Sequence, residues 1–198
     1  MRTAGRKLTV GLIGENPNDT NALIELLNHR YAGRFVACQL VKKQTGDRLG
    51  SAKTQRMLAS NYQAEKPRLV VYIRDLDAPN SDVAKHRERQ QEFANIKKIV
   101  GEQALFLLHV QQFEALLWAD IEKVNQHYGV SLTHKGDPTT IPEPKRKLIS
   151  ATDKPKATKQ YSPNDSAELA AKLDYDTLLR KCLYFSEFDK AFAAKLLK

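Results

Sequence analysis

Short apolar stretches alternate with longer amphipathic stretches over most of the chain. The apolar stretches are strand-sized and rich in β-branched residues and leucine, which is typical of strands buried on both faces. The predicted strands cover residues 8–13, 34–41, 68–74 and 104–110. The predicted helices cover residues 19–31, 51–65, 81–100 and 113–128. Because strands and helices alternate, we expect an α/β fold with a parallel sheet of about four strands flanked by helices.

The pattern changes after Gly129. Between Lys135 and Lys159 the chain carries seven Lys and Arg residues against three acidic residues, and four prolines interrupt regular structure there. Apolar residues at helical spacing return near the C-terminus. We therefore predict an α/β domain over residues 1–130, a basic irregular segment over 131–160 and a C-terminal helical appendage over 161–198.

The composition favours a folded protein with a polyanionic partner. The hydrophobic fraction is 41% and the formal net charge is +9, which suits binding to DNA or RNA. No apolar run is long enough to span a membrane, and the N-terminus has no signal-peptide pattern, so we expect a cytoplasmic protein with no membrane partner. The sequence leaves the oligomeric state open, a homodimer included.

Three acidic residues follow two of the predicted strands. Glu15 comes just after the first strand, and Asp75 and Asp77 come just after the third. Open parallel sheets bind ligands beyond the carboxyl ends of their strands, so these side chains are expected at one edge. Carboxylates gathered there repel one another unless a cation lies among them, and oxygen ligands suit Mg²⁺ or Mn²⁺. In an extended backbone, both aspartates of the D-x-D pattern face the same side.

A purely structural explanation exists for each residue taken alone. Glu15 can serve as an acidic residue at a helix N-terminus, and Asp75 and Asp77 can serve as turn residues before Pro79. The combination of Gly-Glu after the first strand with D-x-D after the third is more specific. It favours a metal site.

This combination resembles the Toprim domain shared by topoisomerases, primases and overcoming-lysogenisation-defect nucleases. The segments GENPNDT, FEALLWAD and YDTLLRKCLYFSEFDKAF also resemble small stand-alone Toprim-like proteins that are encoded beside ATPases and associated with phage defence. Two details depart from that pattern: Trp118 stands where another apolar residue is usual, and Leu116 stands where the tryptophan is usual. The stretch from Pro138 to Lys159 has no clear counterpart, which leaves the substrate open.

The resemblance implies a Rossmann-like Toprim core and a Mg²⁺-dependent nuclease that cleaves phosphodiester bonds in DNA or RNA. It implies that Glu15 acts as a general acid or base near the metal, and that Asp75 and Asp77 ligate it. Whether a second metal binds stays open. By the same resemblance, the protein is the effector of an anti-phage system and is regulated by a partner ATPase of the ABC or AAA type encoded nearby.

Glu114 is a further catalytic candidate, because it begins the helix after the fourth strand at the same sheet edge. A first-turn helix carboxylate explains it equally well. Asp120 is a weaker candidate, since on a straight helix it points away from Glu114. His109 and Trp118 are expected to be a strand residue near the rim of the site and a core or interface residue, respectively.

Four basic residues are weak candidates for nucleic-acid binding. Arg74 either contacts a phosphate or balances the nearby carboxylates, and a strand-end salt bridge is the structural alternative. Lys145, Arg146 and Lys147 can meet a nucleic-acid backbone, although a solvated loop explains them almost as well. We further expect Asn18 or Asp19 to cap the first helix, with Asp19 as a weak supporting residue at the site.

The main alternative function is a non-catalytic Toprim-like subunit that binds nucleic acid or acts as an adaptor in such a complex. A Rossmann-type small-molecule enzyme ranks lower, because no glycine-rich dinucleotide loop follows the first strand. The sequence also lacks a P-loop, a G-x-S-x-G elbow and a zincin histidine pair.

Overall fold

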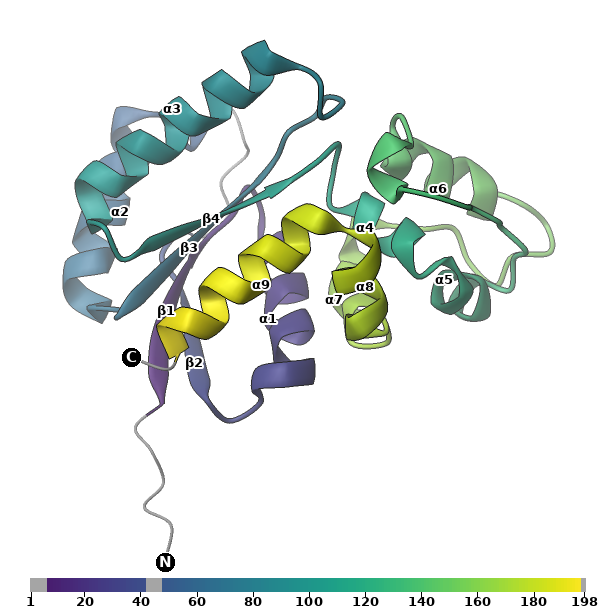
Figure 1. Ribbon diagram of the computed structural model, residues 1–198, viewed down its shortest axis with the longest axis horizontal. Helices are drawn as coiled ribbons and strands as arrows, with labels where there is room; N and C mark the ends of the chain where they lie inside the picture. Colours follow the sequence, from purple (N-terminus) through teal and green to yellow (C-terminus); the bar gives the residue numbers. More distant parts are fainter. Residues whose placement is uncertain (1–6, 42–47, 197–198) are drawn as a thin grey trace, which may run out of the picture.

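The computed structural model describes residues 7–41 and 48–196 and contains a four-stranded sheet in the order β2-β1-β3-β4, with every neighbouring pair parallel (Figure 1). The strands are β1 (Leu8–Ile13), β2 (Phe35–Gln39), β3 (Leu69–Asp75) and β4 (Ala104–His109). Helices flank the sheet, and further helices follow at the C-terminal end. The predicted α/β fold is therefore confirmed, with strand ends that differ from the expected ones by at most two residues.

Helices cover both faces of the sheet (Figure 1). The longer ones are α1 (Pro17–Tyr31), α2 (Ala52–Glu65), α3 (Val83–Val100) and α9 (Leu183–Leu196). On one face, side chains of α2 and α3 such as Leu58 and Ile96 pack against Val70 and Tyr72. On the other face, α1 and α9 enclose the larger core. Both faces of β3 are thus buried, as its continuous apolar run predicted.

The first helix starts earlier than expected. Asn16 is its N-cap and accepts a hydrogen bond from the backbone N–H of Asn18, while the Asp19 carboxylate accepts one from the backbone N–H of Asn16. The prediction that Asn18 or Asp19 is the cap is wrong, because Pro17 is already in the first helical turn, where its missing N–H costs nothing. A Cβ on Gly14 would lie 2.9 Å from Cγ2 of Thr20, so glycine lets this turn close tightly before the helix.

The predicted helix over residues 113–128 is two helices, α4 (Glu114–Ala119) and α5 (Ile121–Tyr128). Asp120 separates them with φ −118° and ψ 59°, outside the helical region. Its Oδ2 accepts a hydrogen bond from the backbone N–H of Asp174 at 2.7 Å. The helix breaks because this side chain bonds to a remote backbone group, which no local pattern reveals.

Residues 131–160 are not irregular throughout. They include the short 3₁₀ helix η2 (Pro138–Thr140) and the helix α6 (Pro144–Thr152). Leu148 of α6 is fully buried in the main core, and the Thr152 hydroxyl accepts a hydrogen bond from the backbone N–H of Tyr161 at 2.7 Å. The prolines obscured this helix, although Pro144 occupies its first turn, where proline is favoured.

The C-terminal region is helical, as predicted. It contains the 3₁₀ helix η3 (Pro163–Asp165), α7 (Ser166–Ala170), α8 (Tyr175–Lys181) and α9. These helices belong to the same hydrophobic core as β1 and β3, and the rings of Phe192 and Phe35 lie 5.9 Å apart. The division of the chain into parts 1–130, 131–160 and 161–198 stays a prediction.

Among the described residues, no helix combines the length and the apolar character needed to cross a membrane.

Candidate functional site

The predicted acidic residues lie at one edge of the sheet. β1 and β4 both pair with β3, and Asp75 at the end of β3 lies opposite His109 at the end of β4. Glu15 follows β1, Asp77 follows β3, and Glu114 opens the helix that comes after β4. Adjacent parallel strands therefore deliver all four carboxylates to the edge at which such sheets bind ligands.

Glu15 forms an ion pair with Arg74, whose Nη1 donates to Glu15 Oε1. Burial nevertheless raises the pKa of Glu15, since it outweighs the opposing effect of Arg74, and the charge of Asp77 raises the pKa further. Glu15 is thus a carboxyl group that takes up a proton more readily than an exposed glutamate does.

Asp75 has few partners for its charge. Its Oδ1 accepts one hydrogen bond from the backbone N–H of Phe113, at 3.0 Å. Loss of solvent around the carboxyl raises the pKa of Asp75 well above its usual range, and nearby carboxylates raise it further. These carboxylates belong to Glu114, Asp19, Glu15 and Asp77. The edge therefore concentrates negative charge around Asp75.

Asp77 lies on the exposed side of the cluster. Its Oδ2 is 3.4 Å from Nη2 of Arg89, and its Oδ1 accepts a hydrogen bond from the side-chain amide of Gln112 at 3.3 Å. Its side chain is 43% exposed, so that oxygen lone pairs remain open to solvent. Asp77 is the member of the cluster that a ligand can reach most directly.

Glu114 and Asp19 complete the cluster. Glu114 is 3% exposed, accepts a hydrogen bond from the Tyr161 hydroxyl at 2.9 Å and lies 3.9 Å from Nζ of Lys145. Burial raises the pKa of Glu114 despite these two partners. Burial also raises the pKa of Asp19 to about 6, and the charges of Glu15 and Glu114 contribute to that shift. Asp19 therefore lies near enough to the acidic residues for their charges to act on it, in addition to its hydrogen bond at the start of α1.

Two arginines balance part of this charge, and both are held by Glu92 of α3. Arg74 donates through Nε to Glu92 at 3.0 Å, and Arg89 donates through Nη1 to Glu92 at 2.9 Å. Arg89 also donates through Nε to the backbone carbonyl of Asp75 at 2.9 Å. Glu15, Arg74, Glu92, Arg89 and Asp77 therefore form one chain of alternating charges, which we call the arginine network.

The sequence prediction missed Arg89 and Glu92. The sequence contained a signal, because Arg89 has the helical spacing that places it on the same face as Ile96 and Val100, and all three are buried in α3. An arginine on the apolar face of a helix needs a buried carboxylate partner. Arg74 is 4% exposed and is bound by Glu15 and Glu92, so it balances carboxylates as one of the two expected roles required. Its contact with a nucleic-acid phosphate stays a prediction.

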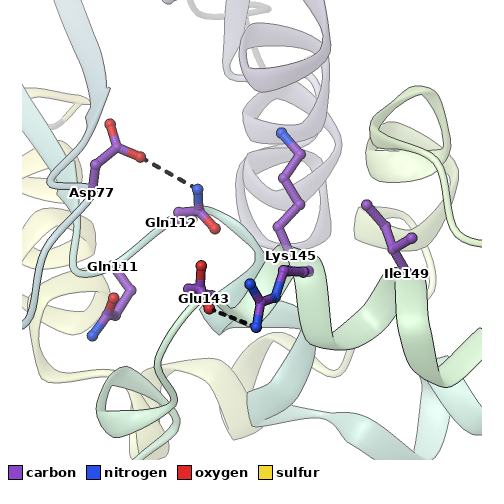
Figure 2. A pocket seen from close by; sticks show the side chains of 7 residues that line it. Asp77, Gln111, Gln112, Glu143, Lys145 and Ile149 are labelled. Carbon is purple, nitrogen blue, oxygen red and sulfur yellow. Dashed lines mark hydrogen bonds and ion pairs between the residues drawn. The ribbon is translucent and has the colours of Figure 1, made fainter.

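A pocket of about 320 Å³ opens beside Asp77 (Figure 2). Its lining consists of Asp77, Gln111, Gln112, Glu143, Lys145, Arg146 and Ile149. Lys145 and Arg146, both predicted to meet nucleic acid, thus lie next to the acidic edge. Lys147 is exposed and is not part of the pocket lining.

Backbone strain gathers at this pocket. Asp77, Gln111 and Glu143 have φ angles of 56°, 61° and 49°. Within the described ranges, only one other non-glycine residue, Lys66, has a positive φ. Left-handed backbone costs such residues roughly 1 kcal/mol each and persists where the surrounding structure enforces it, often at functional sites. Here the backbone N–H of Asp77 donates to the carbonyl of Gln111 at 2.7 Å and locks the two loops together.

Three other candidate residues have structural roles. His109 is 2% exposed and packs edge-on against the rings of Phe113 and Tyr184, and burial lowers its pKa to about 3. Trp118 is buried and donates from Nε1 to the carbonyl of Pro144 at 3.1 Å. Asp120 holds the break between α4 and α5, as described above.

The donor chemistry of the cluster fits a hard divalent cation, because all its side-chain ligands are carboxylate oxygens under mutual repulsion. In the described part of the chain, however, no group of three His, Cys, Asp or Glu side chains is arranged to hold a metal ion. The arginine network instead supplies the neutralising charge for Glu15 and Asp77. Metal binding by Glu15, Asp75 and Asp77 stays a prediction and requires their side chains to rearrange.

Comparison with known proteins gives a family but no activity. Neither the curated proteins nor the solved structures include a match to this chain. A family model described as "Domain of unknown function (DUF4276)" matches residues 15–192. The match spans well over half of the chain and runs from Glu15 into α9. The chain therefore belongs to the DUF4276 family.

Proposed function

We propose that this protein is a Mg²⁺- or Mn²⁺-dependent nuclease of the Toprim type that cleaves phosphodiester bonds in DNA or RNA. The observation that carries the proposal is the convergence of Glu15, Asp75 and Asp77, with Glu114, at the carboxyl edge of three adjacent parallel strands. The raised pKa values of Glu15, Asp75 and Glu114 support it, because carboxylates kept together at a cost in free energy are typical of functional sites.

Each residue has a chemical role in this proposal. Asp75 and Asp77 would hold the metal, which when bound would polarise the phosphoryl oxygen and offset developing charge. Glu15 would take or give the proton at the attacking or departing oxygen, a role suited to a carboxyl group with a raised pKa. Arg74 would orient Glu15 through their ion pair. Glu114 would add charge to the metal side of the cluster.

The biological setting follows from the resemblance to stand-alone Toprim-like proteins. We infer a cytoplasmic effector of an anti-phage system that a partner ATPase of the ABC or AAA type regulates. The net charge of +9 supports a nucleic-acid partner. A homodimer is compatible with this role.

The test is a cleavage assay on labelled DNA and RNA, with Mg²⁺, with Mn²⁺ and with EDTA, and with candidate ATPases present and absent. Glu15→Gln and Asp75→Asn/Asp77→Asn should abolish the metal-dependent cleavage. Glu102→Gln is the matched control, since Glu102 is 87% exposed and precedes β4 at the opposite edge of the sheet. Cleavage that persists in the cluster variants would show that the site is assigned wrongly.

A second function, a non-catalytic subunit that binds nucleic acid or links partners, is favoured by two observations. Arg74 and Arg89 already neutralise Glu15 and Asp77, and no metal-ligand group is assembled among the described residues. Calorimetry with Mg²⁺ and Mn²⁺ separates the two functions. An adaptor should bind these ions no better than its Asp75→Asn/Asp77→Asn variant, whereas a nuclease should lose most of its metal affinity in that variant.

A further inference from the structure

The pocket beside Asp77 combines opposite charges on facing walls. Asp77 and Gln112 lie on one side, and Lys145 of α6 lies on the other (Figure 2). Arg146, the next residue of α6, also lines the pocket. The side chain of Arg146 is 77% exposed, and its one ion pair among the residues that the structure describes is with Glu143, at 3.2 Å. Such an exposed pair contributes little and exchanges readily for a phosphate, which guanidinium groups bind strongly.

Two amide side chains contribute hydrogen-bonding groups to the same pocket. Gln111 lines the pocket and is 8% exposed, and its side-chain amide, which has no hydrogen-bond partner among the described residues, is not one of the fully buried polar groups. Its backbone is fixed, since its N–H donates to the carbonyl of Ala78 at 3.2 Å and its carbonyl accepts from Asp77 at 2.7 Å. An amide in a pocket wall with free donors and acceptors suits the edge of a nucleobase, which presents both.

The size of the pocket limits what enters it. A volume of about 320 Å³ is at the lower end of small-ligand sites and suits one nucleotide unit rather than a duplex groove. A duplex also covers the Watson–Crick edges of its bases by pairing, and its binding needs cations spread along a surface. Here the two lining cations, Lys145 and Arg146, sit on one turn of one helix.

We propose that this pocket binds a single unpaired nucleotide of a nucleic-acid strand, with Arg146 and Lys145 on its phosphate, the amides of Gln111 and Gln112 on its base, and Ile149 against its apolar face. The proposal rests on the proposed function in that it names the substrate of the same site. It makes single-stranded DNA or RNA, or an unpaired end, the preferred substrate class. It also places the bound phosphate next to Asp77 and the acidic edge.

The phosphate contact is tested by comparing Arg146→Glu with Lys147→Glu. Both variants change one exposed cation of α6 to an anion, but only Arg146 lines the pocket. We would measure binding of short labelled DNA and RNA single strands by fluorescence anisotropy in EDTA, over a range of salt concentrations. Arg146→Glu should weaken binding about tenfold. It should also reduce the slope of log affinity against log salt concentration by about one, the amount expected for one lost phosphate contact. Both changes should be much smaller in Lys147→Glu.

The base contact is tested with Gln111→Asn. Asparagine tolerates left-handed backbone, so this variant keeps the turn and only withdraws the amide. It should weaken binding of a normal strand about fivefold, as expected for one lost hydrogen bond, and leave the affinity for a strand with abasic sites unchanged. Circular dichroism of each variant confirms that it is folded.

Three results would overturn the subsite: equal losses in Arg146→Glu and Lys147→Glu, equal losses of normal and abasic strands in Gln111→Asn, or a blunt duplex that binds as tightly as a single strand. Because the binding assay contains EDTA, it does not depend on catalysis. A protein that shows this binding pattern but no metal-dependent cleavage would keep the subsite and lose the nuclease function. A protein that shows metal-dependent cleavage without this binding pattern would keep the nuclease function and lose the subsite.

Discussion

Two aspartates of this molecule, Asp189 and Asp75, have opposite surroundings. Asp189 of α9 is 4% exposed and is surrounded by donors. It accepts hydrogen bonds from the hydroxyls of Tyr31 and Tyr175, both at 2.7 Å, and from Arg30 at 2.9 Å. Asp75 accepts one backbone hydrogen bond and is surrounded by other carboxylates.

The two environments show how the same side chain serves stability in one place and works against it in another. Asp189 joins α1, α8 and α9, and its donors compensate for the loss of water around it. Asp75 lacks such compensation, as its raised pKa shows. A carboxylate that destabilises the fold at a sheet edge is typical of a functional site.

Asp75→Asn should produce the largest effect on activity and the opposite effect on stability. If the proposed function is right, metal-dependent cleavage should fall about a thousandfold, because a metal ligand is lost. The free energy of unfolding without metal should rise by about 1 kcal/mol, since a repelled charge is removed while Asn still accepts from Phe113. Urea unfolding measures this change. A loss of stability would show that the charge of Asp75 does not destabilise the fold, and that Asp75 does not differ from Asp189 in this respect.

Asp189→Ala should produce the largest loss of stability. Removing this carboxylate leaves two buried tyrosine hydroxyls without their acceptor, which should lower the free energy of unfolding by about 3 kcal/mol. Cleavage and nucleic-acid binding well below the midpoint of thermal unfolding should not change. Glu187→Ala, at an exposed position on the same helix, should change stability by less than about 0.5 kcal/mol. A stable Asp189→Ala variant that loses activity would place α9 in the functional site.

The pH dependence of stability should report the charge at the acidic edge. Asp19 has a pKa of about 6 in the folded protein, against 3.8 as its ordinary value. Between these two values the folded state binds a proton that the unfolded state does not, so the contribution of Asp19 to stability is present at low pH and is lost as pH rises through about 6. From pH 4 to pH 7 this group should lower the free energy of unfolding by about 2 kcal/mol.

Asp19→Asn isolates that contribution, because asparagine keeps an oxygen that accepts from the backbone N–H of Asn16. The difference in unfolding free energy between this variant and the wild-type protein should grow as pH rises from 4 to 7. Urea unfolding at several pH values measures it. A constant difference would mean that neither burial nor the charges of Glu15 and Glu114 raise the pKa of Asp19 in solution.

Tyr161→Phe should have the smallest effect on stability. It tests whether the buried carboxylate of Glu114 depends on a hydrogen-bond donor, as Asp189 does, or lacks such compensation, as Asp75 does. Glu114 is buried and has one hydroxyl donor, so losing that donor should lower the free energy of unfolding by about 1 kcal/mol. Tyr62→Phe is the control, because the Tyr62 side chain is only partly buried. An unchanged stability would show that solvent at the edge satisfies Glu114.

The strands and the acidic residues were predictable from the sequence because they depend on short-range patterns. A run such as Leu69–Asp75 is apolar on both faces, which limits it to a buried strand. Parallel order then places Glu15, Asp75 and Asp77 at one edge whatever the details of packing. Ser51 as the cap of α2 was predictable for the same reason, since its partner lies three residues away.

The arginine network and the break at Asp120 were not predictable in this way, because their partners are remote in the sequence. Arg74 meets Glu92 of α3 as well as Glu15, and Asp120 meets the backbone of Asp174. The helix α6 escaped prediction because its apolar face is narrow and its flanking prolines are typical of loops. Its position against the acidic edge depends on Leu148 reaching the main core.

The sequence by itself determined the order of strands and helices and the type of residue that ends each strand, because these follow from local spacing and composition. The tertiary structure decided which carboxylates are compensated and which are not. It joined Asp77 with Lys145 and Arg146 around one pocket. It gave Asp189 three donors while leaving Asp75 among other acids. The physical reason is that the free energy of a buried charge depends on neighbours brought together by packing, and those neighbours come from distant parts of the chain.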